Sequence, residues 1–323
     1  MRSPDWLMLV LACGATPALE AATGERGSGN TWVLTAGGDV DGDGGFLIDG
    51  SAALTLRERS TFTLRTGYSD ASTVSDTLTA TTLDLDYDQR FSHWGFTLTG
   101  GYWKDPDLVE AVDYGGSVYF APGHGLRLSA AVSARASRFN EFTVNGVVPR
   151  PNLPPLTVSG SAGCDLGDLA HSARLSFDGE RWGAYVAGKS YDYDSLQCAF
   201  TSLALGGVPV RIDRLRALNP EITRLITLRA TAAGFINLRE NTVFLDSSMS
   251  AGLSLLGRGH LYAVDYVRTT ELLDGLVSNA FTASVTFTLS HRTDLEFHIG
   301  MFDGQGTGAS GFAGALLVAH LSD

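Results

Sequence analysis

Apolar and polar side chains alternate along stretches of ten or more residues, and this alternation constrains the fold more than any other feature. Residues 77–90 illustrate the pattern, with apolar Leu83, Leu85 and Tyr87 set between polar Asp84, Asp86 and Asp88. Successive side chains of a β-strand point to opposite faces, so a period of two residues predicts strands with one apolar and one polar face. Helical spacing is absent outside a short stretch at residues 212–218. The chain is therefore expected to be all-β.

The expected strands are long. They cover residues 31–39, 45–57, 60–70, 77–90, 93–103, 111–121, 125–138, 169–178, 181–193, 198–211, 222–236, 242–256, 259–270, 278–290, 293–302 and 311–321. Strands of soluble sheets usually have about five or six residues, whereas a strand that crosses a membrane at a tilt needs about nine to eleven. The lengths favour a transmembrane barrel over a soluble sandwich.

The connections between these strands alternate between tight turns, such as 58–59 and 179–180, and longer segments, such as 104–110 and 139–168. Short turns at one rim and longer loops at the other are typical of a transmembrane antiparallel up-and-down β-barrel. Alternation is complete with about sixteen strands. Pro209 falls inside the strand expected at 198–211 and weakens that assignment, because proline cannot donate to a ladder. Fourteen strands are the alternative if residues 194–221 form one long loop.

Four prolines stiffen the longest expected loop, 139–168. The loop is predicted to be extended and to have one of two roles. It folds into the lumen as a constriction, or it presents a binding surface outside the barrel.

Composition and charge exclude several classes of protein. Hydrophobic residues make up 44% of the 323 residues, charged residues 18%, and the mean hydropathy is +0.06. Past residue 22 no apolar run approaches the roughly 18–20 residues of a membrane helix, which argues against a polytopic helical protein. The net charge of −12 supplies no basic face for nucleic acid.

The first residues predict export. A basic start, a short apolar core at residues 6–12 and small residues after it form a signal peptide over residues 1–21. Residues 22–323 would then be a single barrel domain. A competing cleavage site before Cys13 would make the chain a lipoprotein.

Together, the signal peptide, the long amphipathic strands and the alternating connections resemble a Gram-negative outer-membrane β-barrel protein of porin-like size. The resemblance covers nearly the whole mature chain and is architectural, without a family-specific motif. It implies a location in the cell outer membrane. The partners it implies are outer-membrane lipids, lipopolysaccharide and the barrel assembly machinery, and it leaves the oligomeric state open.

Each strand is expected to turn its apolar face to lipid and its polar face to the lumen. The lipid-facing set is Phe62, Leu64, Tyr68, Leu83, Leu85, Tyr87, Trp94, Phe96, Leu98, Tyr102, Val118, Phe120, Val285 and Phe287. The lumen-lining set is Asp49, Arg65, Asp84, Asp86, Asp88, Arg127, Arg135, Arg174, Lys189, Arg229, Asp246, Glu296 and His298. An Arg or Lys at the bilayer midplane costs about 2–4 kcal/mol, so the charged face must meet water.

The mixed charges of the lumen-lining set indicate either a general diffusion pore or a closed, salt-bridged interior. The function we predict is a passive pore for small hydrophilic solutes. Asp84, Asp86 and Asp88 form the one local cluster of the lumen-lining set. They belong either to a hydrated wall balanced by arginines of neighbouring strands or to a cation-selective constriction. The alternative function is a non-conducting barrel that binds at the surface, acts as a scaffold or serves as an assembly partner.

Asp39, Asp41 and Asp43 have the opening spacing of an EF-hand calcium loop, but Gly50 stands where the bidentate acid is required. The segment also lies between two strands, and Asp-Gly and Gly-Gly pairs are ordinary hairpin chemistry. Two interpretations stay open, a plain turn without a cofactor and a Ca²⁺ or lipopolysaccharide-bridging site at the outer rim.

Cys164 and Cys198 flank the hairpin that turns at residues 179–180, at similar distances from the turn. Both should therefore lie near the outer rim, and export favours their pairing as a disulfide.

No catalytic residues are predicted, and the chain is not expected to be an enzyme. The seven histidines are scattered and no nucleophile-elbow motif occurs. His171 with Ser172 or Ser176 is the pair that an outer-membrane hydrolase, the least favoured alternative, would use.

Overall fold

The computed structural model describes residues 30–42, 44–57, 59–72, 77–105, 109–150, 153–194, 196–200, 208–210, 245–257, 259–272, 275, 277–304 and 308–322. Their strands are β1 (Thr31–Asp41), β2 (Phe46–Leu56), β3 (Ser60–Ser72), β4 (Thr77–Arg90), β5 (Trp94–Asp105), β6 (Val109–Gly123), β7 (Leu126–Arg150), β8 (Leu153–Asp178), β9 (Trp182–Tyr193), β10 (Leu196–Phe200), β11 (Val208–Val210), β12 (Leu245–Leu256), β13 (His260–Glu271), β14 (Val277–Ser290), β15 (Thr293–Gly304) and β16 (Gly308–Ser322). No helix in this part of the chain is long and apolar enough to cross a membrane.

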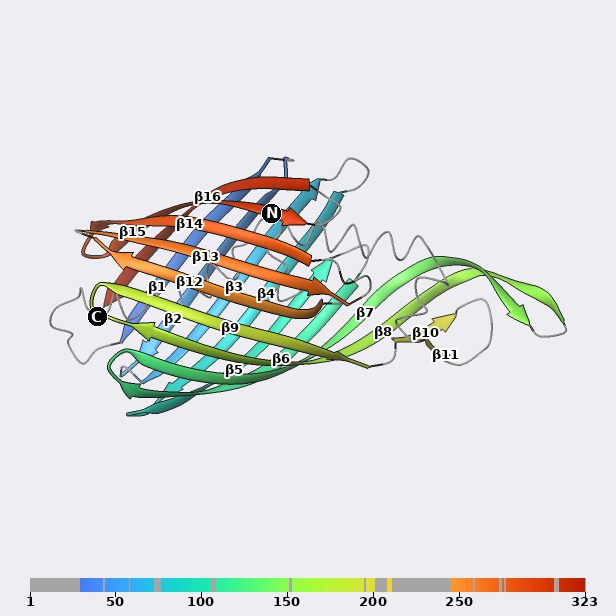
Figure 1. Ribbon diagram of the computed structural model, residues 1–323, viewed down its shortest axis with the longest axis horizontal. Helices are drawn as coiled ribbons and strands as arrows, with labels where there is room; N and C mark the ends of the chain where they lie inside the picture. The colour runs from blue at the N-terminus through green and yellow to red at the C-terminus, as the bar shows by residue number, and fades with distance from the viewer. Residues whose placement is uncertain are drawn as a thin grey trace.

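Fourteen of these strands close into an antiparallel barrel (Figure 1). Each strand from β1 to β9 pairs with the next, β9 pairs with β12, and β12 to β16 continue the wall until β16 pairs with β1. The all-β up-and-down barrel predicted from the sequence is confirmed, with the smaller of the two strand numbers.

The strand expected at 198–211 does not enter the wall. Residues 196–200 and 208–210 form the short strands β10 and β11 instead, and β10 pairs with residues 162–165 of β8. Because β9 pairs directly with β12, the closed wall leaves no place between them. The other strand expected there, 222–236, lies outside the described residues.

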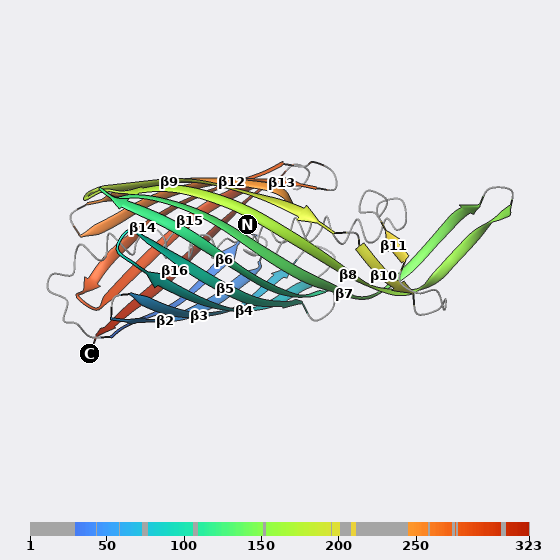
Figure 2. The same cartoon turned by 90° about the horizontal axis from the view of Figure 1, so that it is seen from below.

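The loop expected at 139–168 is largely β-structure. β7 and β8 remain paired as far as Arg150 and Leu153, and Figures 1 and 2 show this hairpin projecting far beyond the barrel. β6 stops pairing with β7 at Phe139, so the projecting part of β7 is an edge strand. Edge strands tolerate proline, so Pro149 is compatible with this part of β7. The prediction of a loop at 139–168 is therefore wrong for most of its length.

The two ends of the barrel differ. The turns β2–β3, β4–β5, β6–β7, β8–β9, β12–β13 and β14–β15 lie at one end, which we term the turn rim, and the β7–β8 hairpin projects from the opposite end, the hairpin rim. In the β6–β7 turn Gly125 has a φ of 78°, and a Cβ there would collide with the backbone of Asp178. Glycine is therefore required at this turn.

Large apolar side chains are exposed on all fourteen barrel strands, up to 57% for Leu85 and 65% for Ile299, whereas the alternate position Glu296 is 1% exposed. A soluble protein would bury the first set and expose the second. The wall therefore has an apolar outer face and a polar inner face, the distribution of a transmembrane barrel.

Candidate functional site: the barrel interior

Most of the polar side chains singled out by sequence alternate with the exposed apolar residues of their strands, and so lie on the inner face. They are Asp49, Arg65, Asp84, Asp86, Asp88, Arg127, Arg135, Arg174, Lys189, Glu296 and His298. Asp246 differs, because it is exposed at an irregularity in the β12–β13 pairing. Arg229 lies outside the described residues.

The three aspartates of β4 have different partners. Asp86 pairs with Arg65 of β3 at 2.5 Å. Asp88 accepts hydrogen bonds from Thr97 (2.9 Å) and Tyr119 (3.3 Å). The carboxylates of Asp84 and Asp113 both lie beside Gly101 of β5, so close that a Cβ at this glycine would collide with both of them. The pairing of Asp86 is of the kind that a hydrated, arginine-balanced wall requires.

Glycines on the inner face let side chains meet across an intervening strand. Gly95 of β5 lies opposite Tyr119, Gly252 of β12 lies opposite both Tyr185 and Asp265, and Gly314 of β16 lies opposite both His298 and Asp39. A Cβ at any of these glycines would collide with the facing side chains. The missing Cβ therefore creates a gap that side chains from the strands on either side fill.

Two of these glycine gaps hold the same arrangement of arginine, tyrosine and aspartate. Arg127 lies over the ring of Tyr119 at 3.7 Å, and Tyr119 donates to Asp88 across β5.

In the second, Arg174 lies over Tyr185 at 3.9 Å, and Tyr185 donates to Asp265 at 2.9 Å across β12. Stacking on an aromatic ring fixes the plane of a guanidinium and leaves its N–H groups directed outward from the edge.

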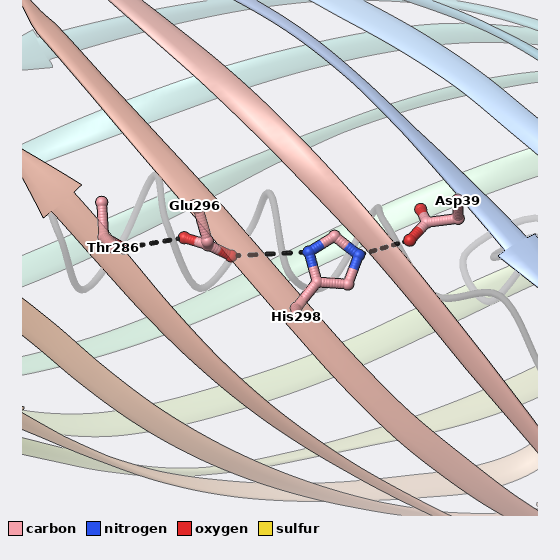
Figure 3. A network of polar contacts seen from close by, with 4 residues as sticks. All are labelled: Asp39, Thr286, Glu296 and His298. Atoms are coloured by element: carbon pink, nitrogen blue, oxygen red, sulfur yellow. Dashed lines mark hydrogen bonds and ion pairs between the residues drawn. The ribbon is translucent and has the colours of Figure 1, made fainter. Parts of the chain in front are cut away.

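The third gap holds a buried network of acidic groups and one imidazole (Figure 3). His298 Nε2 contacts Asp39 Oδ1, and His298 Nδ1 lies 3.8 Å from Glu296 Oε1. Thr286 donates to Glu296 Oε2 at 3.0 Å. At most 5% of the side-chain surface of His298, Glu296 or Asp39 is exposed. This network is closed to solvent and joins β1, β14 and β15.

Apolar side chains line the interior nearer the hairpin rim, in three clusters. The first is Ala280, Phe302 and Phe312; the second is Ala80, Trp103, Val109 and Ala111 with Phe139; the third is Ala170, Tyr191 and Leu245 with Tyr193. The interior thus has an apolar zone towards the hairpin rim and a charged zone between it and the turn rim.

Only part of the predicted calcium site, which consists of Asp39, Asp41 and Asp43, falls within the described residues. Asp39 is buried against His298. The side chain of Asp41 and all of Asp43 lie outside the described residues. In the part of the chain that the structure describes, no three His, Cys, Asp or Glu side chains are grouped so that they could hold a metal ion.

Cys164 and Cys198 lie in paired strands. Cys198 of β10 is directly opposite Cys164 of β8, beyond the end of the β6–β7 pairing. Directly opposite residues of antiparallel strands have Cα atoms about 4.5–5.5 Å apart, within the roughly 7 Å that a disulfide allows.

His171 does not form the pair that a hydrolase would need. It is 49% exposed on the outer face, with Nε2 3.6 Å from Asp192. Ser172 and Ser176 have the opposite parity on β8, and Ser176 is buried. The histidine and the serines therefore lie on different faces of the wall.

Tyr119 and Tyr185, on which Arg127 and Arg174 stack, were not among the predicted inner residues. Their signal was present, because each has the parity of the charged residues on its own or neighbouring strand. It was overlooked because tyrosine was expected at the lipid interface.

No known protein family matches the sequence, and no curated protein does. Two solved structures are similar over nearly the whole chain. The monoaromatic hydrocarbon channel CymD has a TM-score of 0.54 at 9% identity, over 95% of this chain and 93% of CymD. A deletion mutant of the monoaromatic hydrocarbon channel TodX has a TM-score of 0.50 at 11% identity, over 97% and 93%.

The chain is an outer-membrane β-barrel by fold. This confirms the architectural resemblance on which the sequence analysis relied. A closed barrel satisfies every ladder hydrogen bond within the wall, and an apolar outer face suits lipid. We therefore place the chain in the outer membrane.

Proposed function

We propose that the chain is a passive outer-membrane channel for small hydrophilic solutes. The observation that carries this proposal is the partial exposure of inner charged side chains: Arg65, Arg127, Arg174 and Lys189 are all half-buried on the inner face. Side chains that only stabilised a solid interior would be fully buried. Both similar structures are named as channels, which supports conduction as the role.

A second candidate solute is a small apolar molecule. The three apolar clusters near the hairpin rim favour it, and CymD and TodX are named for monoaromatic hydrocarbons. The two candidates differ in which zone of the interior limits passage.

Single-channel recording of the purified full-length chain in planar bilayers tests conduction. We expect stable open-channel currents in KCl that change when Asp84, Asp86 and Asp88 are replaced together by Asn. A heat-dependent shift in gel mobility shows that the barrel is folded. If such folded protein carries no current, the non-conducting alternative is favoured. Liposome swelling with arabinose and with toluene then separates the hydrophilic from the apolar candidate.

We also propose that the barrel reaches the membrane through a signal peptide over residues 1–21, that the assembly machinery inserts residues 22–323, and that lipopolysaccharide contacts the outer rim. A disulfide between Cys164 and Cys198 would fasten β10 to the base of the β7–β8 hairpin. The register between the two residues supports this bond.

A further inference from the structure

The projecting part of the β7–β8 hairpin has two long edges, and the chain protects them unequally. On β8, β10 pairs with residues 162–165 at the base, and the adjacent Pro154 and Pro155 near the tip lack N–H donors. β7 stops pairing with β6 at Phe139, and no other strand in the described part of the chain pairs with β7 beyond that residue except β8. The projecting edge of β7 is therefore the one that stays open to another strand.

This open edge is long enough to take a strand. It runs from Asn140 to Arg150 and contains no proline before Pro149. At about 3.3 Å per residue its length is roughly 35 Å. A row of unpaired N–H and C=O groups of this length is a template for pairing with another chain, and proteins without a use for such an edge shorten or block it.

The sequence of the edge is complementary to itself in charge. Glu141 and Arg150 are the charged residues of the segment 140–150, one near each end. When two copies of a strand pair antiparallel through the same edge, a twofold axis relates them and each pair of opposed residues occurs twice. With the axis between Asn145 and Gly146, Glu141 of each copy lies directly opposite Arg150 of the other.

The same register also suits the uncharged positions. It places Val144 opposite Val147 and Thr143 opposite Val148, and directly opposed β-branched residues stabilise antiparallel sheets. Pro149 falls next to the end of the overlap, where its missing N–H interrupts the ladder least. Registers that place either charged residue opposite its own copy bring like charges together. Charge therefore selects one register.

The direction of the hairpin decides where the second copy lies. β7 runs from the turn rim through the barrel wall and out into the projection (Figures 1 and 2). Antiparallel pairing reverses this direction in the second copy, so the two barrels lie at opposite ends of a joint four-stranded sheet. Since each barrel spans a membrane, the two copies belong to facing membranes.

We propose that residues 141–150 of β7 pair antiparallel with the same residues of a second copy in an opposing membrane, so that the chain links two outer membranes. The proposal goes beyond conduction and does not depend on it, because the contact lies outside the barrel.

Vesicle association measured by energy transfer tests the proposal. The full-length chain is reconstituted into two vesicle populations, one with a donor lipid dye and one with an acceptor, so that the signal reports contact between different membranes. We expect wild-type vesicles to associate. Glu141→Arg and Arg150→Glu each place like charges at both ends of the joint sheet. Each variant alone should therefore lower the rate of association about tenfold or more, because many copies act together on every vesicle.

Mixing the two variants is the decisive arm. Vesicles with Glu141→Arg opposed to vesicles with Arg150→Glu again have opposite charges at both ends, so association should return to nearly the wild-type rate. A chain with both substitutions keeps its net charge and should also associate, which separates the register from bulk charge. Ser159→Arg is the matched control and should associate like the wild type, because it adds the same charge to β8, outside the pairing.

Three results overturn the proposal. They are dispersed wild-type vesicles, single variants that associate as fast as the wild type, and a mixture of the variants that does not recover. A dimer within one membrane gives the first of these results, since it produces no signal between populations. Currents recorded from the same protein report the proposed channel separately, whichever way the vesicles behave.

Discussion

The walls formed by β7–β9 and by β15, β16 and β1 lie on opposite sides of the barrel, since β8 and β1 are half-way round the strand order from each other. Both carry inner charges. The β15–β1 wall is acidic, and its charges are buried in the closed network of Asp39, His298 and Glu296. The β7–β9 wall is rich in cations that stack on tyrosines or lack partners. The contrast teaches that the first wall buries its polar groups in contacts with one another, whereas the second leaves Arg127, Arg174 and Lys189 half-buried on the inner face.

The largest effect should come from removing the centre of the buried network. His298→Leu leaves Asp39 and Glu296 buried without the imidazole between them, and breaking a buried ion pair in this way costs about 3–5 kcal/mol. Urea unfolding in lipid vesicles measures the loss.

His320→Gln is the control, because His320 also contacts a carboxylate, Asp294 at 2.9 Å, but its side chain is 23% exposed. The free energy of unfolding should fall by less than in His298→Leu, because the imidazole of His320 is partly solvated and only its partner Asp294 is buried, at 6% exposed. Equal losses in the two variants would remove the distinction between a buried and a partly solvated pair.

A smaller loss is expected when the gap over β16 is filled. The methyl group of Gly314→Ala would collide with Asp39 and His298, and overpacking of this kind costs about 1–3 kcal/mol. Gly188→Ala is the matched control, because no atom lies within 4 Å of a Cβ at that position. Indistinguishable stabilities of the two variants, by the same urea measurement, would show that the gap is not needed for the contact.

On the β7–β9 wall, Tyr185→Phe removes the hydroxyl that donates to Asp265 and keeps the ring under Arg174. We expect about 1–2 kcal/mol of destabilisation, the contribution of one hydrogen bond to a charged acceptor, and little change in single-channel current. Tyr185→Ala removes the ring as well, so it should alter the current by freeing Arg174. A current unaffected by the alanine variant would separate the stacking from conduction.

The smallest effect on the barrel should follow removal of the proposed disulfide. Cys164→Ser lies where β8 begins to leave the wall, so the urea midpoint should move little. Limited trypsin digestion should cut within the β7–β8 hairpin faster than in the wild type, because β10 is no longer held to it. Identical digestion rates under oxidising and reducing conditions in the wild type would count against the bond.

The barrel could be predicted because apolar and polar residues alternate along nearly every strand of the wall. It placed β4 at residues 77–90 without error, since alternating Leu and Asp leave only one face for lipid. The projecting hairpin was wrongly expected to be a loop, although its prolines correctly indicated an extended chain. Proline is compatible with a strand that has one unpaired edge.

The site was predictable to the level of a face and no further. The alternation of side chains correctly places Arg135 and His298 on the inner face. It does not show that two nitrogens of Arg135 lack a partner among the described residues, or that the imidazole of His298 lies between two carboxylates. Such contacts depend on which strand lies two places away, and closure of the barrel decides that. Nothing in the sequence around Gly314 indicates that Asp39 and His298 come into contact beside it.

The contact between His298 and Asp39 joins residues 259 positions apart. It reaches across β16, the strand whose pairing with β1 closes the wall. The two partners meet only when the two ends of the chain are paired, so the contact forms with the pairing of β16 and β1 and not before it. A spectroscopic probe at His298 would therefore report that pairing.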